Sequence, residues 1–154
     1  MTRSKIFLIG TFSCFLVSAC TQKPAPAQEQ AAQANVEKKV YFLNLKNGDH
    51  VKSPLLVKFG VTGMQVHPAG QDMADTHSGH HHLLIDNAAG FVQQGQVIPM
   101  DAKHVHYGKG QLEDKISLEP GPHKLTLQFA NGAHISYGSD MAASVSIIVD
   151  APQK

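Results

Sequence analysis

The chain lacks several features that would indicate a function directly. It has only two cysteines, and Cys14 falls in a segment that we expect to be cleaved, so the mature chain can form no internal disulfide. Its 13 basic and 12 acidic residues nearly balance, and loss of Arg3 and Lys5 with that segment leaves 11 against 12. This balance provides no basic face, which argues against nucleic acid as a partner.

The common catalytic motifs are also missing. The sequence contains no G-x-S-x-G nucleophile elbow, no H-E-x-x-H metalloprotease motif and no glycine-rich loop that leads into a helix. A metal-dependent enzyme would need an open coordination position together with a general base and a substrate pocket, and no sequence feature supplies the last two. We therefore leave the enzyme question open and favour a non-catalytic protein.

The N-terminus resembles that of a bacterial lipoprotein. Arg3 and Lys5 precede the apolar stretch IFLIGTFSCFLV, which is too short to span a bilayer stably and is typical of a signal peptide. The stretch ends in Val-Ser-Ala-Cys20, which resembles the lipobox, where cleavage precedes the cysteine and the new N-terminus is acylated. We expect residues 1–19 to be a lipoprotein signal peptide and Cys20 to be the lipidation site. An ordinary secretion signal would leave Cys20 unpaired in an oxidising compartment.

Residues 20–39 are predicted to form a flexible tether. They are mostly Pro, Ala, Gln and Lys and contain too few large apolar side chains to build a core. A lipid anchor would hold the protein on a membrane surface without a transmembrane helix. By analogy with other lipoproteins, Thr21 suggests the outer membrane. We therefore expect a protein of the cell envelope that faces the periplasm, and any protein partner is expected to be another envelope protein.

Residues 40–150 are predicted to form one all-β domain, an immunoglobulin-like two-sheet β-sandwich. Apolar residues alternate with polar ones over short segments separated by turn signals, and no segment shows a helical period over three turns. The domain size is close to the roughly 100 residues of such a sandwich. Side chains predicted to face the core are Leu55, Val57, Phe59, Val61, Leu112, Ile116, Leu118, His123, Leu125, Leu127, Phe129, Val145, Ile147 and Val149.

Two His-x-His pairs carry the most specific chemical signal. Alternate residues share one face of a strand, so His80 and His82 form one pair and His104 and His106 form another. Segment 80–85 has apolar residues on both faces, which is typical of a central strand. If the two pairs lie on adjacent strands, four imidazoles can reach one ion. The predicted metal ligands are therefore His80, His82, His104 and His106.

Further candidate ligands surround these pairs, and they bear on the choice of metal. Zinc and copper both accept imidazole, copper binds more tightly to a given set of nitrogens, and thioethers favour Cu(I). The expected cofactor is thus copper or zinc, bound for buffering or delivery. The secondary candidates are His67, His77, His81 and His134 with Met64, Met73 and Met100, several of them in the long segment 63–79.

A second hypothesis needs no metal. In it the histidines form a hydrogen-bonded network that holds the long segment 63–79, and the protein is an interaction or structural module of the envelope. Methionines can fill gaps in a core without binding any ion. His123 follows a Pro-Gly turn and is predicted to be a buried, hydrogen-bonded core residue. Asp86 and Asp101 are predicted to be turn residues or partners that orient a histidine.

The segments VYFLNLKNGDHVKSPLLVKFGVTGM, HPAG, GHHHLLID, IPMDAKHVHYGKGQ and LEPGPHKLTLQFANGAH together resemble a bacterial family, the domain of unknown function 4399. The resemblance runs in order over nearly all of residues 40–149. It implies an exported domain in which the matching positions, His80, His81, His82, His104, His106, His123 and His134, are characteristic histidines. The family has no established function, so the resemblance implies that the histidines matter and leaves their chemistry open.

Overall fold

The computed structural model describes residues 36–153, so the predicted signal peptide, Cys20 and most of the predicted tether lie outside the described residues. Within this range the chain is all-β, as predicted, with a single turn of 3-10 helix, η1 (Ser139–Met141). None of the described residues forms a helix long and apolar enough to cross a bilayer. The strands in chain order are β1 (Lys39–Phe42), β2 (Asp49–Val51), β3 (Leu55–Thr62), β4 (Gln65–Val66), β5 (Ser78–Ile85), β6 (His104–His106), β7 (Glu113–Ile116), β8 (Gly121–Ala130) and β9 (Ala142–Val149).

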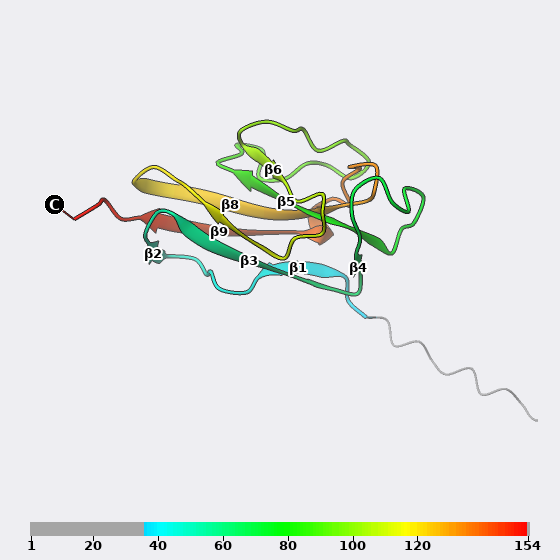
Figure 1. The fold of residues 1–154 in the computed structure, drawn as a ribbon, viewed down its shortest axis with the longest axis horizontal. Helices are drawn as coiled ribbons and strands as arrows, with labels where there is room; N and C mark the ends of the chain where they lie inside the picture. Colours follow the sequence, from blue (N-terminus) through cyan, green and yellow to red (C-terminus); the bar gives the residue numbers. More distant parts are fainter. Residues whose placement is uncertain (1–35, 154) are drawn as a thin grey trace, which may run out of the picture. The chain divides into compact units, whose positions relative to one another are not determined.

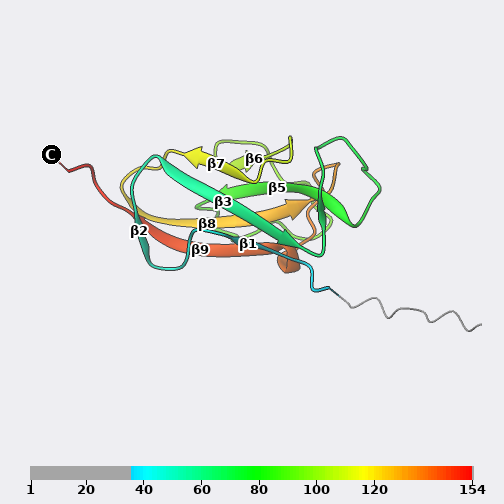
Figure 2. The ribbon, with the colours of Figure 1, turned by 60° about the horizontal axis from the view of Figure 1, so that its bottom comes forward.

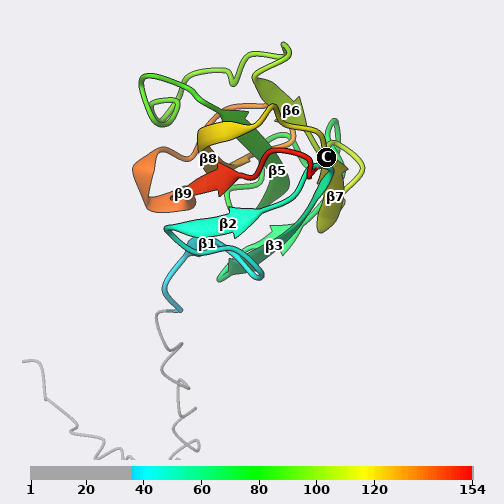
Figure 3. The same ribbon diagram turned by 90° about the vertical axis from the view of Figure 1, so that its left-hand side faces the viewer.

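The strands form two sheets, which confirms the two-sheet prediction (Figure 1). One sheet has three strands in the order β1-β3-β7, and the other has six, ordered β2-β9-β8-β5-β4 with β6 also paired to β5. Seen end-on, β1 and β3 lie beneath β9, β8 and β5, and the two layers face each other (Figure 3). Two pairings, β2 with β9 and β4 with β5, are parallel, and the period-two pattern carried no information about them.

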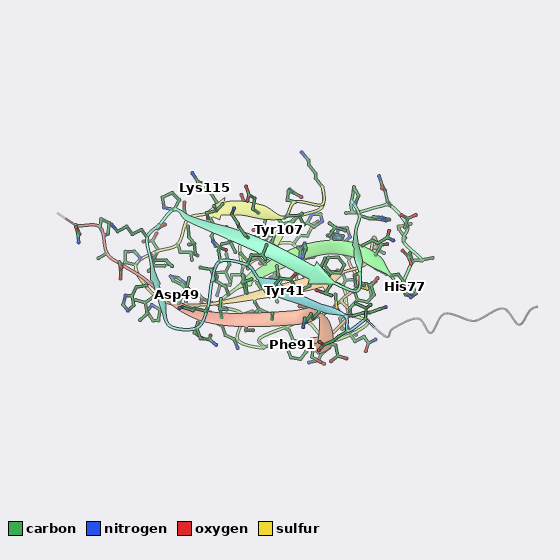
Figure 4. All side chains as sticks on the ribbon, turned by 90° about the horizontal axis from the view of Figure 1, so that it is seen from below. Tyr41, Asp49, His77, Phe91, Tyr107 and Lys115 are labelled. Carbon is green, nitrogen blue, oxygen red and sulfur yellow. The ribbon has the colours of Figure 1, made fainter. Side chains whose placement is uncertain are left out.

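The main core fills the space between the sheets, and its residues follow the predicted alternation. Val57 and Phe59 of β3 pack against Leu125, Leu127 and Phe129 of β8, all of them buried. Because successive side chains on a strand point to opposite faces, this alternation fixes which side of each strand is buried. Tyr107 also belongs to this core, close to β3 in Figure 4, and its ring contacts that of Phe59. The prediction for Leu112 was wrong, because this residue precedes β7 and is 52% exposed.

A second, smaller core lies on the outer face of the six-stranded sheet. The segment between β5 and β6 folds back over β5 and β8, on the side away from β1 and β3 (Figure 1). There Ile98 packs against Leu84 of β5 and Ala130 of β8. The backbone of Val92 both donates to and accepts from the Gln128 side chain, at 2.9 and 2.7 Å. β5 is therefore covered on both faces, as predicted for a central strand, and its residues Ser78–Leu84 are all buried.

Candidate metal site

The two His-x-His pairs lie on neighbouring antiparallel strands, as the metal hypothesis requires. β5 pairs with β6 in a register that sets His82 opposite His106 and Leu84 opposite His104. The strands are thus offset by two residues from the alignment in which all four histidines would face one another. Strand β6 lies beside β5 (Figure 2). The offset carries His104 away from His80 and leaves His106 beside both histidines of β5.

His80, His82 and His106, named here the three-histidine group, can hold a metal ion. Each offers one ring nitrogen, and these atoms all lie within 4.8 Å of one another. The Nε2 atoms of His80 and His82 are only 3.0 Å apart and share a hydrogen bond. Both rings are fully buried, whereas His106 is partly exposed. Their burial and their grouping around one point are what a metal site requires.

A fourth imidazole, from His134, contacts the same group from a different element. His134 lies in the turn after β8, and its Nε2 is 3.2 Å from the Nε2 of His106. Its ring centroid is 5.1 Å from that of His80 and 5.9 Å from that of His82. We call His80, His82, His106 and His134 the histidine cluster. The sequence marked His134 only as a secondary candidate, because nothing local shows that a turn after β8 reaches β5.

The turn that carries His134 is tightly held. The Asn131 side chain accepts hydrogen bonds from the backbone N–H groups of Ala133 and Ile135, at 3.0 and 2.9 Å. The His134 carbonyl accepts one from the N–H of Ile98. His134 itself adopts a left-handed backbone conformation, with φ of 64°, which costs about 1 kcal/mol or more in a non-glycine residue. Such strain persists only where the surrounding contacts determine the position of the residue.

The long segment 63–79 connects the two sides of the histidine cluster. The N–H of Ala69 donates to the carbonyl of Gly108, two residues after His106, and the N–H of Gly70 donates to the carbonyl of Gly132, two residues before His134. β5 begins directly after His77, which is labelled at one end of the domain in Figure 4. Gly108 also lies against the His106 ring, so closely that a methyl group added at Gly108 would overlap the ring atoms.

The cluster environment favours neutral imidazoles. Burial, followed by the charges of neighbouring histidines, lowers the pKa of His80 to about 4 and that of His82 to about 2. Burial and the neighbouring His134 also lower the pKa of His106. Neutral imidazole is the form that ligates a metal, since a protonated ring nitrogen has no lone pair to donate. At neutral pH these rings therefore present lone pairs without first losing a proton.

The structure does not bring His104 into the three-histidine group, although it was predicted as a ligand. Its Nδ1 lies 2.8 Å from the Oδ1 of Asp101, which also accepts the N–H of Lys103. Asp101 is therefore both a turn residue and a histidine partner, and the two roles predicted for it coexist.

The secondary candidates outside the cluster have other surroundings. His67 pairs with Asp72 at 2.8 Å, and the exposed His77 lies 3.5 Å from Asp75. Of the three candidate methionines, Met73 and Met100 are 59% and 70% exposed, and Met64 packs against the main core. The thioether argument for Cu(I) therefore gains no support from these positions.

His81 points to the opposite face of β5 and lies in the main core. Its ring centroid is 5.5 Å from Phe59 and 4.9 Å from Phe129. Burial lowers the pKa of His81 to about 4, and the nearby backbone of Gly60 partly opposes this shift. Neither ring nitrogen of His81 has a hydrogen-bond partner within the usual geometry for such a bond. His81 is thus a core residue that must stay neutral, on the face away from the cluster.

His123 is hydrogen-bonded at both ring nitrogens, as predicted, and it lies at the edge of the core. Its Nδ1 is 2.7 Å from Oδ2 of Asp86, and its Nε2 is 2.8 Å from the carbonyl oxygen of Glu119. Burial lowers the pKa of His123, but the two oxygens outweigh it and the net shift is upward. With both nitrogens engaged, His123 has none free for a metal.

The three cavities described for residues 36–153 lie away from the histidine cluster. Cavities of about 710, 450 and 360 Å³ open elsewhere on the domain, and none is lined by a member of the cluster.

Comparison with known families gives one match. A family model described as a domain of unknown function (DUF4399) matches residues 57–150, which include all four histidines of the cluster. Searches of curated proteins and of solved structures found no match to the chain.

Proposed function

The chain belongs to the DUF4399 family, and we propose that it binds a transition metal ion, copper or zinc, through His80, His82 and His106. The observation that carries this proposal is the convergence of three imidazoles, two of them fully buried, with their ligand atoms within 4.8 Å. Burying several polar rings around one point is costly unless they are paired. A shared ion would satisfy all three at once.

The lack of hydrogen-bond partners around the buried histidines favours a site that releases its metal ion readily. A ligating histidine almost always donates its second ring N–H to an oxygen, and loss of that support costs about 10- to 100-fold in affinity. The Nδ1 atoms of His80 and His82 are buried without such a partner. We therefore expect weaker binding than at a fully supported structural zinc site, which suits buffering or delivery better than permanent retention.

The test compares two histidines on one strand. Protein purified without a histidine tag should take up one equivalent of Cu²⁺ or Zn²⁺, measured by elemental analysis after dialysis and by calorimetric titration. His106→Ala should lower the affinity strongly, because it removes a ligand. His104→Ala is the matched control: the residue shares β6 and its face but lies outside the group, so uptake should persist. Equal uptake by wild type and His106→Ala would refute the proposal.

A second candidate function rests on the hydrogen bonds between the rings. The Nε2 atoms pair at 3.0 Å between His80 and His82 and at 3.2 Å between His106 and His134. A metal-free network of this kind would make the domain an interaction or structural module for an envelope partner. It predicts no thermal shift with any ion. We favour the metal because one ion could bind three converging imidazoles at once, whereas the hydrogen bonds join the rings only in pairs.

We also propose that the domain works in the cell envelope, tethered to a membrane by lipid on Cys20. The support is the sequence Val-Ser-Ala-Cys after a short apolar stretch and the Pro- and Gln-rich segment that follows. Cys20→Ser should release the protein from the membrane fraction of expressing bacteria. Mass spectrometry of the wild-type N-terminal peptide should show an acylated cysteine, and an unmodified one would refute this part of the proposal.

A further inference from the structure

The histidine cluster contains more than a three-ligand site. Six ring-centroid distances connect its four imidazoles, and five of them lie between 4.7 and 5.1 Å, the sixth being 5.9 Å. Four points that are all nearly equidistant form a tetrahedron. The rings are mutually inclined by 32° to 82°, as rings directed at one centre from different sides must be.

These distances match a four-imidazole ion site. With metal–nitrogen bonds of about 2.05 Å, a tetrahedral centre sets its nitrogens about 3.3 Å apart and its ring centroids about 5.2 Å apart. The two hydrogen-bonded Nε2 pairs, His80–His82 and His106–His134, are 3.0 and 3.2 Å apart. His134 is not among the residues whose ligand atoms all lie within 4.8 Å of one another, so a bound ion would have to draw its ring inward. A square-planar centre would need four neighbouring centroids at about 4.5 Å and two opposite pairs at about 6.4 Å. Only the His82–His134 pair approaches the longer value, and the opposite pair, His80–His106, is 4.9 Å apart.

We propose that His134 is the fourth ligand and that the cluster is a closed, tetrahedral four-imidazole site whose natural ion is Zn²⁺. This inference rests on the proposed metal binding and specifies its geometry. Zn²⁺ has no geometric preference from its d electrons and is usually tetrahedral, whereas Cu²⁺ favours tetragonal sites. A closed shell of four protein ligands leaves no position for water, which is typical of non-catalytic zinc sites.

The fold supplies His134 by a route separate from the other three ligands. His80, His82 and His106 come from paired strands, and their positions follow from the sheet register. His134 comes from the Asn131–Ile135 turn, whose backbone is bonded to Ile98 on one side and, through Gly132, to Gly70 on the other. The left-handed conformation of His134 is thus held by contacts on two sides, and its ring meets His106 at 3.2 Å.

The test uses the full chain with His134→Gly, because glycine adopts a φ of 64° without strain and leaves a space the size of an imidazole. Co²⁺ is the spectroscopic probe, since tetrahedral Co²⁺ absorbs visible light far more strongly than six-coordinate Co²⁺. Wild type should bind one Co²⁺ with the intense tetrahedral spectrum. The variant should bind Co²⁺ with a shifted and weaker spectrum, because water replaces the imidazole and leaves an open site, and added imidazole should restore the wild-type spectrum. His67→Ala, a partly exposed histidine held by Asp72, is the matched control and should behave as wild type.

Metal preference gives an independent readout. The variant should lose Zn²⁺ affinity by more than about 10- to 100-fold, the range known for loss of an outer-shell partner alone. It should lose less affinity for Cu²⁺, because three ligands and water can rearrange toward a tetragonal site. An unchanged spectrum and unchanged Zn²⁺ affinity in His134→Gly would overturn the fourth-ligand inference and leave the proposed function standing. Failure of wild type to bind Co²⁺, Zn²⁺ or Cu²⁺ would overturn both.

Discussion

Replacement of His81 by leucine should remove part of the acid sensitivity of the domain, the rest being due to groups such as His80 and His82. His81 is buried between Phe59 and Phe129, and its pKa of about 4 lies well below the ordinary 6.5. Above pH 6.5 the ring is neutral in both the folded and the unfolded chain. Between 6.5 and about 4 only the unfolded chain takes up the proton, so the free energy of unfolding falls with decreasing pH. At about 1.4 kcal/mol per pH unit, the loss due to His81 reaches about 3 kcal/mol.

His81→Leu abolishes this contribution, since leucine does not titrate and has a similar volume. It also removes two buried ring nitrogens that have no partner, which should stabilise the protein by about 1–3 kcal/mol even at pH 7.5. Urea unfolding with a chelator present, at pH values from 7.5 to 4, measures both effects. The difference from wild type should grow by about 3 kcal/mol as the pH falls.

Phe129→Leu is the matched control for this prediction, because it alters the same ring contact without a titrating group. It should lower the free energy of unfolding at every pH and leave the slope unchanged. If His81→Leu also ran parallel to wild type, the folded protein would bind the His81 proton as readily as the unfolded chain does. The argument from burial would then be refuted.

Three other perturbations test the surroundings of the histidines. Gly108→Ala should weaken Zn²⁺ binding measured by calorimetry, because the new methyl overlaps the ring of His106, and unchanged affinity would contradict this packing. Asp86→Asn removes the charge that helps raise the pKa of His123, so the NMR titration midpoint of His123 should fall. A raised pKa of His123 stabilises the folded state below pH 6.5, and this stabilisation is lost as the pH rises. The free energy of unfolding of Asp86→Asn should therefore fall further below that of wild type at pH 5 than at pH 8. An equal decrease at both pH values would refute the argument. Zn²⁺ at 100 times its Kd should raise the free energy of unfolding by about 2.7 kcal/mol, and calorimetry without a shift would exclude binding to the folded state.

The strands and the faces of their side chains could be predicted from local sequence. Period-two alternation identified the buried faces of β3, β8 and β9, because that alternation is the direct consequence of strand geometry. The same rule separated His80 and His82 from His81, which lies in the core on the other face. It failed for Leu112, which lies just before β7 and outside the paired strand.

The candidate site was predicted only in part. Its three-histidine group includes three of the four predicted ligands, but the fourth, His104, is not in it, and the cluster is instead completed by His134. Both differences have one origin: they depend on contacts between residues far apart in the chain. The β5–β6 register sets His106 rather than His104 beside His80, and pairing of His80 with Ala130 brings the turn after β8 to the cluster.

The sequence by itself determined that the domain is all-β and that two histidine pairs lie on single strand faces, since both follow from the side-chain period of a strand. Only the tertiary structure decided which imidazoles meet. A shift of register by two residues preserves every inward and outward face, so the alternation pattern is equally satisfied by several registers. The choice among them comes from long-range packing, including the segment 63–79 that bonds to Gly108 and Gly132 on either side of the cluster.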